Sequence, residues 1–102
     1  MKACCAEYLN LQFGGDDDVA NEIYREYVDS IREKLKEAGA ALAGGEWLPL
    51  DRVAHTIKGN ALSTGDGEMA QVAIDLRSAA QLQDREQAAS LIARIQELEG
   101  QL

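Results

Sequence analysis

Apolar residues recur at intervals of three and four along most of the chain, and no segment alternates convincingly between apolar and polar positions. This periodicity predicts helices and no strands. The first long helix is expected to begin after the FGG segment, where the acidic run 16–18 supplies an N-cap, and to end at the glycine pair 44–45. Its apolar positions are Val19, Ile23, Tyr27, Ile31, Leu35, Ala38 and Leu42.

Three further helices are predicted downstream. The second opens near residue 46 and runs to about residue 64, because Pro49 is tolerated only in the first turn of a helix. Gly65 and Gly67 make the turn into the third helix, and the fourth begins at Asp84. The expected core positions of these last two helices are Met69, Val72, Ala73, Leu76, Ala80, Ala88, Leu91, Ile92, Ile95, Leu98 and Leu102.

Connections this short force neighbouring amphipathic helices to run antiparallel. The expected fold is therefore all-α: an up-and-down antiparallel four-helix bundle over residues 16–102, with residues 1–15 as an N-terminal segment that packs on the bundle. Within that segment, residues 3–11 are expected to form a short helix or lid. The length of 102 residues and the hydrophobic content of 46% fit one small domain.

Charge limits the kinds of partner that the chain can bind. With a formal net charge of −8 and a sequence pI near 4.5, the surface should repel nucleic acid and anionic membranes, because both are polyanions. A protein, or a site that carries a cation, is the expected partner.

The cysteines indicate a reducing, cytoplasmic setting. Cys4 and Cys5 are the only two, and neighbours in sequence seldom bridge each other, so no disulfide framework is expected. The sequence predicts neither a signal peptide nor a membrane-spanning helix. One histidine and two distant cysteines lack the spacing of a zinc site, so no metal is expected.

The single histidine, His55, lies on the wrong side of its predicted helix for a core residue. At about 100° per residue, the apolar positions from Leu50 to Thr64 cluster on one side and His55 points the opposite way. Two leucines, about two turns on either side, would form an exposed apolar patch around the imidazole. The residues that share the side of His55, and that we expect to bind a partner, are Leu48, Asp51, Arg52, Gly59 and Leu62, with Lys58 beside them.

The residues around His55 have two interpretations, a site for phosphoryl transfer and an ordinary solvated surface. A neutral imidazole is a competent nucleophile toward phosphorus, and Lys58, one turn away, could stabilise the charge of a transferred phosphoryl group. The simpler alternative makes His55 one more solvated side chain and pairs Lys58 with Asp51 or Asp66.

The segment AHTIKGNALSTG resembles the histidine-containing phosphotransfer (HPt) domains of two-component phosphorelays. Their signature is an alanine and a histidine, lysine and glycine at the third and fourth positions after the histidine, and a glycine six residues later. GGEWLPLDRVAH and FGGDDDVANEIYREYV resemble the family's helix openings, and Thr64 and the pair 66–67 depart from its usual residues. The matching residues are Ala54, His55, Lys58, Gly59 and Gly65.

The resemblance implies a function. His55 would be the phosphoacceptor, Lys58 the supporting cation, and Gly59 the residue that gives a partner access. The expected partners are the receiver domain of a response regulator, a hybrid sensor histidine kinase, or both, with Mg²⁺ in the receiver and no cofactor in this chain.

The expected protein is a monomeric phosphoryl carrier, not an enzyme. An ATP-dependent kinase, where one acts, is expected to lie outside these 102 residues, which leave no room for an ATP-binding domain. The main alternative is a helical adaptor that binds a receiver or kinase domain without being phosphorylated.

Overall fold

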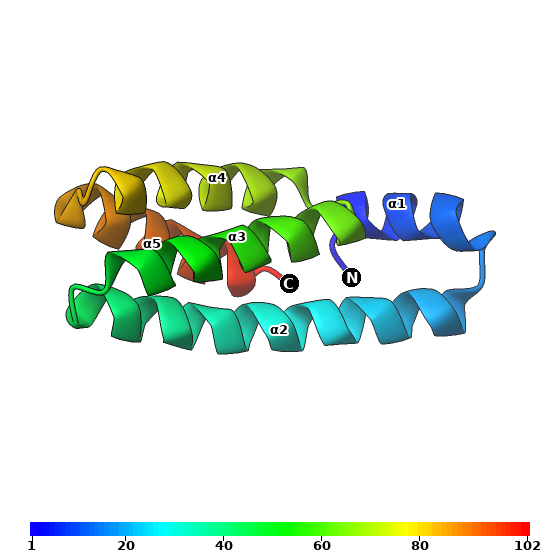
Figure 1. Cartoon of the computed structure of the whole chain (residues 1–102). Coiled ribbons are helices and arrows are strands. Elements are labelled where there is room, and N and C mark those ends of the chain that lie inside the picture. Colours follow the sequence, from blue (N-terminus) through cyan, green and yellow to red (C-terminus); the bar gives the residue numbers. More distant parts are fainter.

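In the computed structural model, which describes all 102 residues, the chain forms five helices and no strand (Figure 1). The all-α prediction is confirmed, and each helix begins and ends within a few residues of the expected position. No helix is both long enough and apolar enough to cross a membrane. The helices are α1 (Ala3–Phe13), α2 (Asp17–Ala43), α3 (Trp47–Thr64), α4 (Gly67–Gln81) and α5 (Arg85–Glu99).

Helices α2 to α5 form an up-and-down bundle. Each packs against the next in sequence, and α2 also contacts α5, which closes the ring. The connections between them are two or three residues long, so consecutive helices must run antiparallel. The molecule is elongated, with principal extents of 43 × 20 × 18 Å.

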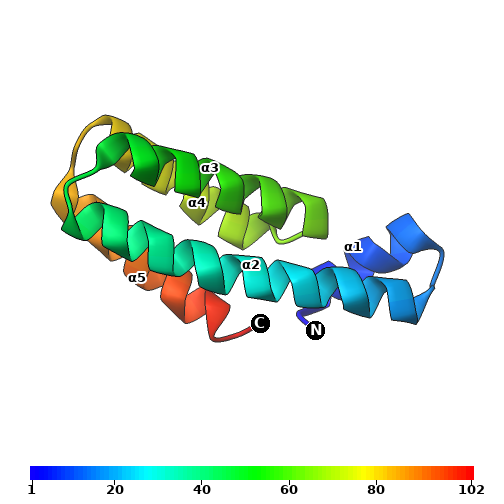
Figure 2. The ribbon, with the colours of Figure 1, turned by 60° about the horizontal axis from the view of Figure 1, so that its bottom comes forward.

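Helix α2 is much longer than its neighbours, and α1 covers the excess. Its 27 residues span about 40 Å, against about 27 Å for the 18 residues of α3. The first turns of α2 therefore extend beyond the end of the α3–α4 pair, and α1 folds back along them (Figure 2). Cys5 and Leu9 of α1 are fully buried there and extend the core.

Aspartates begin three of the four bundle helices. The side chains of Asp16, Asp66 and Asp84 accept hydrogen bonds from the backbone N–H three residues on, at 3.2, 3.2 and 3.1 Å. Each bond satisfies one of the amide groups that a helix start leaves unpaired. The caps at Asp16 and Asp84 were expected, whereas the cap at Asp66 was not.

The buried faces of the helices match the predicted faces, except that the buried face of α2 is rotated slightly about the helix axis. The expected positions of α4 and α5 are buried or partly buried, including Met69, Leu76 and Ile95. On α2 the buried face is turned slightly from the predicted stripe. It includes Ala20, Tyr24 and Ala41, whereas Val19, Ile23, Leu35 and Leu42 are only partly buried.

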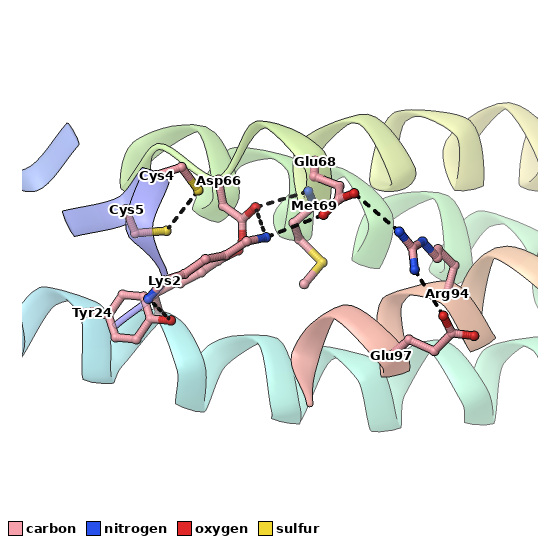
Figure 3. Close-up of polar contacts among 10 residues, drawn as sticks. Lys2, Cys4, Cys5, Tyr24, Asp66, Glu68, Met69, Arg94 and Glu97 are labelled. Carbon is pink, nitrogen blue, oxygen red and sulfur yellow. Dashed lines mark hydrogen bonds and ion pairs between the residues drawn. The ribbon is translucent and has the colours of Figure 1, made fainter. Parts of the chain in front are cut away.

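A buried polar cluster fastens the start of the chain to the bundle (Figure 3). Asp66 is completely buried, and its carboxylate accepts from Lys2 Nζ at 2.9 Å and from Tyr27 Oη at 2.8 Å. Tyr24 accepts from the Lys2 backbone N–H and donates to the carbonyl of Leu102, both at 3.1 Å. No buried side-chain polar atom in the protein lacks a partner, so the cluster carries no unpaired charge.

Candidate functional site

Helix α3 presents His55 to solvent because its opposite side is buried. Ala54, directly before His55, and Ile57, two residues after it, are completely buried, as are Leu50 and Ala61. The alternation at helical spacing leaves the imidazole exposed on the outer face of the bundle. The predicted orientation of His55 is therefore confirmed.

The surface around the imidazole is open and partly apolar. Leu48 and Leu62 are 59% and 54% exposed, and each lies about 10 Å from His55 along the helix axis. Gly59 is exposed one turn after His55, and a Cβ atom placed on it would meet no atom within 4 Å. Nothing within the chain crowds the ring on this side, so a second molecule can approach it.

Lys58 is available to interact with a ligand or partner. It is half-buried on α3, and it forms no ion pair with another residue. The simpler prediction, that Lys58 forms an ion pair with Asp51 or Asp66, is wrong. Both carboxylates are engaged elsewhere, Asp51 by Arg77 and Asp66 by Lys2.

The structure adds Arg77, on α4, to the site. Its Nη1 lies 3.1 Å from Nδ1 of His55, and its Nε donates to Oδ1 of Asp51 at 3.0 Å. Asp51, which we expected to bind a partner, pairs with this arginine and holds it against α3. Gln81 reaches the same oxygen of Asp51 at 3.4 Å.

Periodicity within single helices gave no indication of Arg77, because it says nothing of which residues meet between two helices. Residues 55 and 77 lie at nearly equal distances from the short turn between α3 and α4, and an antiparallel pair brings such residues face to face. That symmetry was the available signal. It also brings Ile74, one turn before Arg77 and 40% exposed, toward this face.

The site is locally basic although the protein is acidic. Arg52, Lys58 and Arg77 surround His55, against a single carboxylate from Asp51, while the whole chain carries a net charge of −8. Such a local excess of cations favours an anionic group at the imidazole. Because Asp51 is paired with Arg77, these residues offer no cluster of oxygen ligands for a divalent cation.

The cysteines take no part in this site. Cys5 is buried in the core beneath α1, and its Sγ lies 4.0 Å from that of the exposed Cys4. Burial, together with the neighbouring Cys4 and Asp66, raises the pKa of the Cys5 thiol to about 12. The thiol therefore stays protonated and unreactive at neutral pH.

Two comparisons bear on the identity of the chain. A family model described as "Hpt domain" matches residues 22–102, whereas no curated protein matches the chain. The fold is similar to a crystal structure of the HPT domain from an Hpt sensor hybrid histidine kinase from Shewanella. That likeness has a TM-score of 0.62 at 15% sequence identity, and it covers 94% of this chain and 92% of the other. Hpt domains are the phosphotransfer modules of two-component phosphorelays, and with more than three quarters of its length inside the family match, this chain belongs to the Hpt domain family.

Proposed function

We propose that this chain accepts a phosphoryl group on His55 and exchanges it with the aspartate of a receiver domain. The observation that carries the proposal is the placement of His55. The ring is exposed at the centre of an open face, with Gly59 one turn away and exposed leucines at both ends. A histidine that served only the fold would need neither the open space nor the apolar rim.

The proposed step transfers phosphorus between two ordinary protein nucleophiles. The lone pair of an imidazole nitrogen attacks the phosphorus of the aspartyl phosphate, an N–P bond forms, and the O–P bond to the aspartate breaks. The carboxylate keeps the electron pair of that bond, and the imidazole loses its proton to water. The reverse step regenerates the aspartyl phosphate.

Lys58 has the position to assist this step. Phosphoryl transfer passes through a loose transition state whose charge is spread over the equatorial oxygens. An ammonium one turn from His55, with no carboxylate already paired to it, can donate to those oxygens. Mg²⁺, which the receiver domain would hold beside its aspartate, would supply the rest of the charge compensation.

The proposed partners are a receiver domain, a hybrid sensor histidine kinase, or both. A receiver that holds its phosphate and Mg²⁺ in a cleft can place them over a convex helix such as α3. The exposed leucines at both ends would then contact the rim of that cleft. We propose that the chain works as a monomeric, cytoplasmic carrier and that any ATP-dependent kinase acts from elsewhere.

The test is transfer of ³²P from a phosphorylated receiver domain. The wild type should gain an acid-labile, base-stable adduct at His55, and His55→Gln should gain none while keeping its helical circular dichroism spectrum. Thr56→Ala, which changes the neighbouring exposed residue, is the matched control and should label normally. Labelling of His55→Gln at the wild-type rate would overturn the carrier function. Binding of the receiver without any labelling of the wild type would favour the adaptor.

A further inference from the structure

The contact between Arg77 and His55 has a fixed polarity. A guanidinium has only N–H donors and keeps its proton in proteins, so Nδ1 of His55 must be the acceptor across the 3.1 Å contact. A neutral imidazole that accepts at Nδ1 carries its hydrogen on Nε2. Nε2 is then the nitrogen that faces a partner. It has a lone pair for attack on phosphorus only in the tautomer with hydrogen on Nδ1, so Arg77 must leave Nδ1 during transfer. Once Nδ1 has lost its hydrogen to water, the contact with Arg77 re-forms on the phosphorylated ring.

The protonation of Nδ1 governs the release of a phosphoryl group from Nε2. When the N–P bond breaks, the ring keeps the bonding pair of electrons. A ring protonated at Nδ1 leaves as neutral imidazole, whereas an unprotonated ring must leave as an imidazolate. Arg77 opposes this protonation in two ways: its N–H occupies the Nδ1 lone pair, and its positive charge repels a second one on the ring.

The guanidinium is itself held in place. Asp51 accepts a hydrogen bond from the Nε of Arg77 at 3.0 Å. The side chain of Asp51 is 19% exposed and that of Arg77 is 31% exposed, so the arginine lies along the bundle surface. Arg52 and Lys58, both on α3, are the other charged residues near the ring. Helix α2 packs on another side of α3, with Ser30 bonded to Asn60, and forms no hydrogen bond or ion pair with His55.

We propose that Arg77, anchored by Asp51, is a positioning residue that keeps Nδ1 of His55 unprotonated and so lengthens the life of phospho-His55. This inference rests on the proposed function, since it concerns the phosphorylated form of the same histidine. The resting geometry already matches the phosphorylated product, with hydrogen in place of phosphorus on Nε2. A carrier arranged in this way retains its phosphoryl group until a partner binds and displaces the arginine.

The first test reads the ring directly, without phosphorylation. In the ¹⁵N-labelled full chain, nitrogen chemical shifts recorded along a pH series report the tautomer of the neutral ring. The wild type should carry its hydrogen on Nε2, and Arg77→Met should shift the population toward Nδ1–H. Arg94→Met removes an equal charge from an arginine on α5 that pairs with Glu68 and Glu97, and it should match the wild type. A wild-type ring with its hydrogen mainly on Nδ1 would overturn the proposal.

The second test measures the lifetime of phospho-His55. The proteins are phosphorylated with potassium phosphoramidate, a small-molecule donor, and hydrolysis is followed by ³¹P NMR across a range of pH. Arg77→Met should shorten the lifetime about three- to tenfold near neutral pH, the effect of losing one hydrogen bond. The difference should vanish in acid, where Nδ1 is protonated in both proteins. Arg77→Gln restores a neutral donor, so its lifetime should lie between those of Arg77→Met and the wild type.

Decay of Arg77→Met at the wild-type rate, or no rescue by Arg77→Gln, would contradict this role. Because phosphoramidate needs no partner protein, these outcomes are independent of the receiver experiment. A wild type that is phosphorylated by phosphoramidate but by no receiver domain would refute the proposed function and leave the effect of Arg77 measurable. A wild type that is labelled by a receiver, with no lifetime change in Arg77→Met, would refute only the role of Arg77.

Discussion

Gly59 has no structural role within its own chain. It lies inside α3, where glycine costs about 1 kcal/mol relative to alanine, and its backbone is ordinary helix. A Cβ atom at this position would meet nothing within 4 Å, so no internal contact requires the missing side chain. No contact within the chain accounts for the glycine, and its position fits the proposed approach of a partner to His55.

This reasoning predicts opposite effects for two substitutions of Gly59. Gly59→Ala should leave thermal stability unchanged or raise it, by up to about 1 kcal/mol, because alanine is the better helix former. Gly59→Glu should slow transfer from a receiver by more than tenfold while the protein stays folded, since it adds bulk and negative charge beside an incoming anion. Transfer rates and melting temperatures of both variants check this. Full transfer by Gly59→Glu would show that access at this position is unimportant.

Lys58 should matter for the rate of transfer more than for binding. Lys58→Ala removes a cation without breaking any ion pair in the free protein, so its stability should change little. The loss should appear in the rate constant for transfer, by about tenfold or more, with receiver affinity nearly unchanged. Rapid-quench kinetics and calorimetric titration separate the two quantities. Equal losses in both would assign Lys58 to docking.

At the scale of elements, the turn between α3 and α4 is the point on which α1 rests. Gly65 ends α3 with φ of +79°, a conformation that side chains other than glycine rarely adopt. A methyl group on Gly65 would also overlap Cβ and Cγ of Tyr8. The same turn continues into Asp66, which holds Lys2 and Tyr27. Backbone conformation, helix packing and a buried charge therefore coincide at one short connection.

Gly65→Ala should destabilise the protein by about 2 kcal/mol or more, because the left-handed conformation alone costs a substituted residue about 1–2 kcal/mol. Gly67→Ala is the matched control, since Gly67 lies in the first turn of α4 with open space around it and no positive φ. That variant should be neutral or slightly stabilised. Urea denaturation of both proteins measures the difference. Similar stabilities would show that neither the positive φ nor the overlap with Tyr8 carries this cost.

In the whole molecule, a set of ionisable side chains in and around the core links residues near the N-terminus to α2 and to Asp66. Burial raises the pKa of Tyr27 and Tyr24, and the hydrogen bond to Asp66 raises that of Tyr27 further. For Lys2, burial alone would lower the pKa, but the hydrogen bond and the charge of Asp66 outweigh it, and the pKa is raised. With Cys5, four groups between α1 and α2 therefore hold their protons more tightly in the folded state than in the unfolded chain.

The fold should accordingly lose stability in alkali. A group whose pKa is raised by folding contributes fully below its unfolded pKa, and that contribution is lost as the pH rises toward the folded value. The unfolded values are 9.0 for cysteine, 10.0 for tyrosine and 10.5 for lysine, so the loss should begin near pH 9 and steepen above pH 10. Denaturant titrations from pH 7 to 11 check this, and Cys5→Ala should delay the onset. A free energy of unfolding that stays constant to pH 11 would contradict it.

Local signals along the chain were enough to predict the helices and the face that carries the histidine. Helical periodicity, three glycine-bearing turns and the position of Pro49 placed the five helices, because these signals act through local backbone geometry. The exposure of His55 also followed locally, since Leu50, Ala54, Ile57 and Ala61 form the buried stripe of α3 and His55 lies on the opposite side. The motif that contains His55, Lys58 and Gly59 indicated the family.

Which side chains meet depends on how the helices pack against one another. Arg77 contacts His55, Asp51 accepts a hydrogen bond from Arg77, and Asp66 pairs with Lys2 across 64 residues of sequence. Helical periodicity specifies the direction of a side chain around its own axis but not the register between two helices. That register depends on how the cores interdigitate and on the exact turn at Gly65, which is why the partners of His55 and Asp66 emerged only when the helices were packed together.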